Sequence, residues 1–308
     1  MSVTPFARAL GAGTLVLDGG TASQLEAAGH DLSDELWSAR LLADRPEAVT
    51  AAHLAYFRAG ADVAITAGYQ ATFEGFARRS TGRAEAARLI ALSVELARSA
   101  VAEAHAGGVT RPLWVAASVG PYGAMLADGS EYRGRYGLDV FELERFHRPR
   151  LEVLAGAGPD VLALETVPDA VEAEALLRAV RGLGVPAWLS YTVDGVRTRA
   201  GQPLEEAFAL AAPVEEIVAV GVNCCAPEDV DRAVEIAARV TGKPVVVYPN
   251  SGETWDARAR AWDGRVTFGA GRTERVEAWR AAGARLIGGC CRVGPAGITG
   301  IARTLGTG

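Results

Sequence analysis

The chain has 308 residues, of which 49% are hydrophobic and 22% are charged, and its formal net charge is -6. This apolar content excludes a disordered chain, and 36 glycines in a mixed composition exclude a long fibrous helix. No apolar run approaches the ~18 residues needed to cross a bilayer, and the acidic balance gives no general attraction for nucleic acid or anionic membranes.

Short β-branched or apolar runs alternate with longer amphipathic segments along the chain. Continuous apolar runs such as Val245 to Val247 are typical of strands that are covered on both faces, as in parallel sheets. The eight predicted strands are TLVLDGG (ending near Gly20), DVAITAGY (from Asp62), LWVAASVGP (from Leu113), VLALETVP (from Val161), AWLSYTVD (from Ala187), IVAVGVNCC (from Ile217), PVVVYPN (from Pro244) and RLIGGCC (from Arg285).

Apolar residues three and four positions apart predict helices between these strands. Asp169 and Thr273 are predicted to cap two of the helices, and Pro227 fits a first helical position. Glycines that favour left-handed C-terminal caps follow four of them, at Gly60, Gly184, Gly242 and Gly283. The clearest helical segments are 46–60, 83–104, 139–155, 169–183, 227–240 and 273–282.

Eight β/α units over this length predict a single α/β domain that spans residues 1–308 and closes into a (β/α)8 TIM barrel. An open dinucleotide-binding sheet is disfavoured because no GxGxxG turn follows the first strand. Two long connections follow the first and third strands, at 30–45 and 122–138. Both lie where barrel active sites are built, so they are interpreted as lids, with surface decoration as the alternative.

The four cysteines form two adjacent pairs, Cys224–Cys225 and Cys290–Cys291. In a reducing cytosol, such clusters favour metal binding or chemistry over disulfides. Cys224 and Cys290 end the sixth and eighth predicted strands, so their backbones are expected about 10 Å apart at ~4.8 Å per strand. A thiolate reaches a zinc ion about 5 Å from its own backbone, so two cysteines span this gap. Gly288–Gly289 is predicted to let the backbone turn, so that Cys291 converges on the same ion.

Three thiolates would leave the fourth position of a tetrahedral zinc ion open, which is typical of a catalytic site. Cys225 would close the site, but strand alternation predicts that it faces the helices if Cys224 faces the barrel axis. The alternative interpretation is that both pairs are buried small hydrophobes.

The ligand type restricts the chemistry. An all-sulfur set makes zinc a poor Lewis acid toward water but a good holder of another thiolate. Hydrolysis is disfavoured because none of the histidines stands at a predicted strand end, these being His30, His53, His105 and His147. A free thiol with a pKa of about 8.5 is mostly protonated at pH 7, and zinc coordination deprotonates it. The sequence therefore predicts activation of a substrate thiol.

With these residues, the sequence resembles the zinc-dependent homocysteine S-methyltransferases from about Leu15 to Ile301. The resemblance is carried by LDGGT at 17–21, ALET ending at Thr166, GVNC at 221–224 and GGCC at 288–291. The segments SVGPYGAMLADGSEYRG at 118–134 and TFEGF at 72–76 look like the S-methylmethionine-using branch of bacteria and plants.

The resemblance implies one zinc ion per chain, bound by Cys224, Cys290 and Cys291, with the homocysteine sulfur as fourth ligand. This chain departs from the family pattern in carrying Cys225 directly after Cys224, at a position that varies among the members. The implied activity is transfer of a methyl group to the homocysteine thiolate by in-line displacement, with methionine as product.

The resemblance also implies substrate-binding residues. The amino-acid-binding acids of the family fall on Asp18 and Glu165, each at a predicted strand end, and an ammonium group needs such anionic acceptors. A helix cap or an ion pair at the barrel mouth is the alternative role for both. Backbone N–H groups around Gly19 and Gly20 could hold the substrate carboxylate, and Asn223 is expected to touch the substrate or to support a residue that does.

The implied donor is a sulfonium, S-methylmethionine or S-adenosylmethionine, whose permanent cation calls for aromatic faces or carboxylates. The candidate donor pocket lies on the connections after the second and third strands, where ordinary packing is the alternative. Its primary candidates are Tyr69, Phe73, Tyr122 and Tyr132, accompanied by Phe76, Tyr136, Glu74, Asp128 and Glu131.

Other functions compete with this interpretation. A betaine-, folate- or corrinoid-linked homocysteine methyltransferase is a rival, although no DxHxxG cobalamin motif is present. Selenohomocysteine or selenocysteine could replace homocysteine as acceptor, and a non-catalytic zinc- or thiol-binding barrel is the rival outside enzymes. The first residues, MSVTPFARALGAG, lack a basic stretch before an apolar core, so a cytoplasmic location is expected, with small molecules as the partners.

Overall fold

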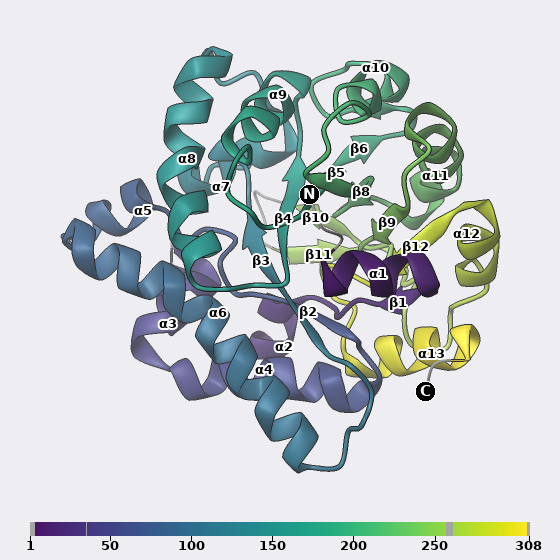
Figure 1. Cartoon of the computed structure of the whole chain (residues 1–308). Helices are drawn as coiled ribbons and strands as arrows, with labels where there is room; N and C mark the ends of the chain where they lie inside the picture. Colours follow the sequence, from purple (N-terminus) through teal and green to yellow (C-terminus); the bar gives the residue numbers. More distant parts are fainter. Residues whose placement is uncertain (1–3, 35, 257–260, 307–308) are drawn as a thin grey trace.

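Eight parallel strands form a barrel surrounded by helices in the computed structural model, which describes residues 4–34, 36–256 and 261–306 (Figure 1). Hydrogen bonds join the strands in the order β1-β12-β9-β8-β5-β4-β3-β2. The barrel strands are β1 (Leu15–Val16), β2 (Val63–Ile65), β3 (Trp114–Val119), β4 (Val161–Val167), β5 (Ala187–Tyr191), β8 (Ile217–Asn223), β9 (Val245–Tyr248) and β12 (Ala284–Ile287). The predicted (β/α)8 fold is confirmed.

The barrel closes between β1 and β2. Leu17, just beyond β1, forms a parallel bridge with Val63. The Asp62 N–H donates to the Val16 carbonyl at 2.7 Å, and the Asp18 N–H donates to the Val63 carbonyl at 3.0 Å. Because the strands all run the same way, their carboxyl ends form one rim, and the connections that follow them gather there.

Helices follow the strands and cover the outside of the barrel (Figure 1). The predicted helical segments are present as α4 (Pro46–Ala59), α6 (Arg83–Ala106), α8 (Val140–Gly156), α9 (Ala170–Ala179), α11 (Pro227–Thr241) and α12 (Val276–Ala282). The sequence pattern missed α10 (Leu204–Ala209), which is only six residues long, and α13 (Pro295–Leu305), in which two glycines interrupt the apolar pattern.

Most predicted helix ends have the predicted chemistry. The Asp169 side chain caps α9 by accepting from the Val171 N–H, and Pro227 begins α11. Thr273 is not a cap, because α12 begins after Arg275 and the Thr273 hydroxyl pairs with that of Thr304 instead. Gly184 is not a cap either, since α9 ends at Ala179. The other three glycines end their helices with positive φ: Gly60, Gly242 and Gly283.

An additional helix, α1 (Pro5–Ala12), precedes the first strand and was not predicted. Its buried residues Phe6 and Leu10 pack into the cluster of side chains that fills the barrel, and the Phe6 ring lies 5.8 Å from that of Trp114 at the start of β3. Because strand starts lie at the amino end of the barrel, α1 covers the end opposite to the rim.

The two long connections at the rim, which were interpreted as lids, contain short helices. Residues 30–45 include η1 (Trp37–Arg40) and α3 (Leu41–Asp44), and residues 122–138 include α7 (Tyr122–Leu126) and η2 (Ser130–Tyr132). Other connections carry α2 (Thr21–Ala27), α5 (Phe73–Arg78) and two hairpins, β6 (Val193–Asp194) with β7 (Arg197–Thr198) and β10 (Thr254–Asp256) with β11 (Ala261–Asp263).

Buried side chains form two main layers. One cluster fills the barrel interior, and a larger one lies between the strands and the surrounding helices. Strands that face both layers must be apolar on both faces, which explains their continuous apolar sequences. Among the described residues, none of the helices combines the length and hydrophobicity needed to cross a membrane.

Candidate functional site

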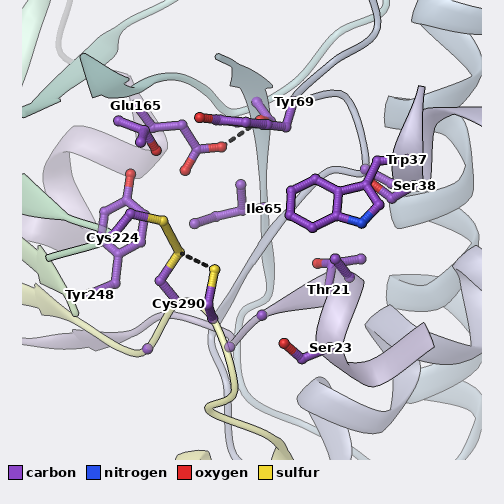
Figure 2. Close-up of a pocket in the computed structure, with 18 of the residues that line it drawn as sticks. Thr21, Ser23, Trp37, Ser38, Ile65, Tyr69, Glu165, Cys224, Tyr248 and Cys290 are labelled. Atoms are coloured by element: carbon purple, nitrogen blue, oxygen red, sulfur yellow. Dashed lines mark hydrogen bonds between the residues drawn. A yellow bond between two sulfur atoms is a disulfide. The ribbon is translucent and has the colours of Figure 1, made fainter. Parts of the chain in front are cut away.

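Three cysteine sulfurs gather at the rim of the barrel. Cys224 follows β8, and Cys290 and Cys291 follow β12. Their sulfur atoms all lie within 4.8 Å of one another, and those of Cys290 and Cys291 are 4.0 Å apart. All three residues line one cavity, and Figure 2 shows the Cys224 and Cys290 side chains pointing toward each other. Strand order therefore brings together cysteines that are 66 residues apart in the chain.

The Cys224 and Cys290 sulfurs are joined as a disulfide in this structure (Figure 2). Their Cα atoms are 5.6 Å apart, about half the predicted separation. The prediction was wrong because it treated the strands as straight. Both segments bend over the end of β9, where the Cys224 N–H donates to the Tyr248 carbonyl at 3.2 Å and the Cys290 N–H to the Pro249 carbonyl at 2.7 Å.

This donor set fits a metal ion once the disulfide is reduced. Two thiolates on a tetrahedral zinc ion at ~2.3 Å are about 3.8 Å apart, and the 4.0 Å between the Cys290 and Cys291 sulfurs is close to that value. Cys225 is 1% exposed and belongs to the layer between barrel and helices. The described residues therefore bring three sulfurs to the cavity, and Cys225 faces away as strand alternation predicts.

The turn that lets the sulfurs converge lies elsewhere than predicted. Cys224 has the positive φ, 48°, whereas Gly288 and Gly289 do not adopt this conformation. These glycines are needed for close packing instead. A Cβ on Gly288 would lie 2.5 Å from Leu17 Cβ, and one on Gly289 would lie 2.3 Å from Val293 Cγ1. Both contacts are too short for any other residue.

Of the two predicted substrate-binding acids, Glu165 lines the cavity with the sulfurs and Asp18 does not. Asp18 is fully buried, and its Oδ2 accepts from the Ile65 N–H at 2.9 Å, while its Oδ1 has no partner. Burial raises the pKa of Asp18 well above its usual range, and the nearby Glu165 raises it further. Glu165, on β4, accepts from the Ser118 hydroxyl. An unpartnered buried carboxylate oxygen calls for a donor, and a cationic ligand would supply one.

The protonation of Glu165 makes stability depend on pH. Burial raises the pKa of Glu165 from 4.5 to about 7. Between these values, the folded protein holds a proton that the unfolded chain releases, so the free energy of unfolding falls as pH rises through this window, by about 3 kcal/mol. Urea unfolding of the reduced, metal-free protein between pH 4 and 8 will show this fall. The fall will be smaller in Glu165→Gln, which keeps the raised pKa of the buried Asp18 carboxyl group, and a constant difference between the two proteins across the window contradicts the assignment.

The glycines after β1 line the cavity and also have a packing role that was not predicted. The Gly20 N–H donates to the Val293 carbonyl at 3.1 Å, so it is not free to hold a substrate carboxylate. A Cβ on Gly19 would lie 2.0 Å from the Val293 oxygen, and one on Gly20 would lie 2.6 Å from the Cys290 oxygen. Gly19 and Gly20 therefore let this turn pack directly against the segment that carries Cys290 and Cys291.

Asn223 supports the site from behind. It is fully buried, its Oδ1 accepts from the Thr166 N–H at 2.7 Å and the Ser190 hydroxyl at 2.8 Å, and its Nδ2 donates to the Thr166 hydroxyl at 2.7 Å. Thr166 has a positive φ of 58°, which a non-glycine residue rarely adopts without such support. Asn223 thus fixes the backbone next to Glu165, and it is not one of the described residues that line the cavity.

Aromatic side chains form the rest of the cavity wall. Of the predicted donor-pocket residues, Tyr69 and Tyr132 line the cavity. Phe73 and Tyr122 do not, because Phe73 packs under Arg83 and the Tyr122 ring packs between Tyr136 and Phe146.

Two further aromatic residues of the cavity, Trp37 and Tyr248, were missed by the sequence analysis. Figure 2 shows Trp37 across the cavity from Cys224 and Cys290. Its place within the long connection after the first strand was the available signal. Tyr248 ends β9, and its hydroxyl accepts from Trp188 Nε1 at 3.1 Å.

Comparison with known proteins agrees with this architecture. The family model described as homocysteine S-methyltransferase matches residues 15–305. The chain is 48% identical to homocysteine S-methyltransferase 4 of Zea mays over 97% of this chain and 91% of that protein. It is 47% identical to the homocysteine S-methyltransferase of Escherichia coli over 93% and 94% of the two chains.

Solved structures show the same likeness. The metallated form of the homocysteine methyltransferase MmuM from Escherichia coli superposes with a TM-score of 0.85 at 44% identity, covering 95% of this chain and 96% of that one. Its oxidized form superposes with a TM-score of 0.86 at 45% identity, covering 94% and 96%. The metallated relative and the sulfur cluster together indicate a metal site. The chain is a methyltransferase and belongs to the homocysteine S-methyltransferase family.

Proposed function

We propose that this protein transfers a methyl group from the sulfonium S-methylmethionine to homocysteine, with one zinc ion held by Cys224, Cys290 and Cys291. The observation that carries the proposal is the cluster of three sulfurs that lines a cavity together with the buried carboxyl group of Glu165 and several aromatic rings. Asp18 is buried directly before the lining residue Gly19 in the chain. The new bond joins the donor methyl carbon to the homocysteine sulfur. The old carbon–sulfur bond breaks with its electrons left on the donor sulfur, so both products are methionine and the thiol proton is released.

Zinc is the metal that suits this donor set, because soft thiolates select it among the common divalent ions and its tetrahedral geometry leaves one position for a fourth sulfur. When bound, it would supply a substrate thiol with the pKa depression that makes a thiolate nucleophile at neutral pH. The chain's own contribution is to hold three sulfurs on one side of the cavity, which β8 and β12 do.

Asp18 and Glu165 would bind the homocysteine ammonium group. Asp18 offers the unpartnered Oδ1, and Glu165 offers a carboxyl group whose pKa of about 7 allows it to be an anion at physiological pH. Their burial excludes competing water, which strengthens a charge-assisted hydrogen bond. The amino acid would then point its sulfur toward the three cysteines, in line with the attack on the donor methyl group.

The aromatic wall would receive the donor. Trp37 faces the sulfur cluster across the cavity (Figure 2), and Tyr69 and Tyr132 belong to the same lining. The faces of aromatic rings attract the positive charge of a sulfonium through the ring quadrupole. Glu131, next to Tyr132, has a buried Oε2 without a partner and adds negative charge on that side.

We place the enzyme in a reducing compartment, the cytoplasm. The disulfide between Cys224 and Cys290 and the metal site use the same two sulfur atoms, so only the reduced protein can hold the ion. Cytosolic thiol systems keep such cysteines reduced.

The test is to purify the protein under reducing conditions with zinc, measure metal content, and measure methionine formed from homocysteine with each of three donors. We expect one zinc ion per chain and the fastest transfer from S-methylmethionine, followed by S-adenosylmethionine. Transfer from betaine alone would point to a different donor class. Bound zinc with no transfer from any donor would reject the proposed reaction.

A further inference from the structure

A second group of ionisable side chains is buried away from the cysteines, between α8 and α9. Glu172, His147 and Arg150 are each at most 1% exposed. His147 Nε2 lies 2.8 Å from Glu172 Oε1, and His147 Nδ1 lies 2.9 Å from Arg150 Nη2. Since a guanidinium only donates, His147 Nδ1 is the acceptor and its Nε2–H donates to Glu172. The three side chains form one hydrogen-bonded network.

Burying such charges costs free energy of folding, and apolar residues of similar volume in their place often stabilise a fold equally. Its specific contribution is to bind the backbone just after β3. Arg150 Nη2 donates to the Gly120 carbonyl at 2.6 Å, and Glu172 Oε1 accepts from the Tyr122 N–H at 2.5 Å. One Glu–His–Arg network thus fixes both ends of the Gly120–Pro121–Tyr122 turn.

That turn packs against Tyr69, and α7, which begins at its last residue, packs against the segment that carries Tyr132. On one side, a Cβ on Gly120 would lie 2.5 Å from the Tyr69 carbonyl oxygen and 2.7 Å from its ring. On the other side, a Cβ on Gly123 would lie 2.4 Å from the Glu131 nitrogen, so α7 packs directly against η2, which carries Tyr132. A movement of the turn by a few tenths of an ångström would be passed to both rings.

We propose that Glu172, His147 and Arg150 are positioning residues for the methyl donor, which place the Tyr69 and Tyr132 rings through the turn at Gly120–Tyr122. This rests on the proposed function, because it assigns the two rings to the sulfonium donor. The cysteines follow β8 and β12 and Asp18 follows β1, away from the elements that carry the network. Glu165 lies on β4 and contacts Ser118 of β3, which precedes the turn. We therefore expect a displaced turn to act on the two rings and to leave metal binding and homocysteine binding unchanged.

The experiment compares Glu172→Gln with Glu174→Gln. Glu174 lies on the same helix, α9, but its side chain is 42% exposed and pairs with Arg178 at 2.6 Å. We expect Glu172→Gln to raise the KM for S-methylmethionine by about tenfold or more, the effect of a ring misplaced by a fraction of an ångström. The KM for homocysteine and the zinc content will stay at the wild-type values, and Glu174→Gln will change none of the three quantities.

A second variant covers the case in which Glu172→Gln fails to fold because the buried Arg150 charge is left without a nearby carboxylate. Gly120→Ala leaves all charges in place and displaces the turn from Tyr69 by its added methyl group. It will raise the donor KM in the same selective way.

Three outcomes overturn the inference: an unchanged donor KM in both variants, equal increases in the two substrate KM values, or loss of zinc from a folded variant. These differ from a failure of the proposed function, in which the wild-type protein itself transfers no methyl group from a sulfonium.

Discussion

Replacing Cys290 with alanine will remove the bound metal and lower methyl transfer by about a thousandfold. Without the ion, a homocysteine thiol with a pKa of about 8.5 is only ~3% ionised at pH 7, which accounts for about thirtyfold. Loss of the alignment between the thiolate and the donor methyl group accounts for the remainder. Metal analysis of the purified variant and initial rates at saturating donor will measure the two effects together.

Cys225→Ala is the matched control, because the two cysteines differ in where they point. Cys225 is buried in the layer between barrel and helices, outside the sulfur cluster. Its replacement removes only a packed thiol, so we expect a loss of about 1 kcal/mol in stability and wild-type zinc content and rate. Loss of metal from Cys225→Ala, or its retention by Cys290→Ala, would show that the ligand set is wrong.

Asp18→Asn will raise the KM for homocysteine by about a hundredfold, with little change in the KM for the donor. The asparagine keeps the shape of the side chain and can still accept from the Ile65 N–H, so the fold is preserved. What is lost is the negative charge facing the substrate ammonium, and a buried hydrogen bond between charged groups contributes about 1.5–3 kcal/mol. Steady-state kinetics with homocysteine varied at saturating S-methylmethionine will measure it.

Asp62→Asn is the control for this substitution. Asp62 makes the equivalent contact at the other end of the barrel, where its Oδ2 accepts from the Val16 N–H at 2.9 Å and its Oδ1 pairs with Arg111 at 3.0 Å. Its replacement will lower stability through the lost ion pair and leave both KM values unchanged. Equal effects of the two variants on homocysteine KM would mean that Asp18 acts only by holding the barrel together.

Features that depend on local chemistry could be predicted well. Alternating apolar runs and amphipathic segments identified all eight barrel strands, and Asp169 caps its helix as its position indicates. Cys224 and Cys290 could be expected to meet because parallel strands end at one rim, whichever side chains surround them. The positions of helix ends could not be predicted as well. Thr273 and Gly184 are residue types that suit several positions near a helix end, and packing placed the ends of α12 and α9 at other residues.

The amino-acid sequence alone therefore determined the barrel, the edge at which the site lies and the three cysteines that gather there, because periodicity and strand order follow from backbone geometry. The tertiary structure decided which side chains face the cavity. Trp37 lines the cavity, whereas Phe73 and Tyr122 pack elsewhere. The Gly20 N–H donates to the Val293 carbonyl. These outcomes depend on contacts between segments far apart in the chain, and such contacts leave no local pattern to read.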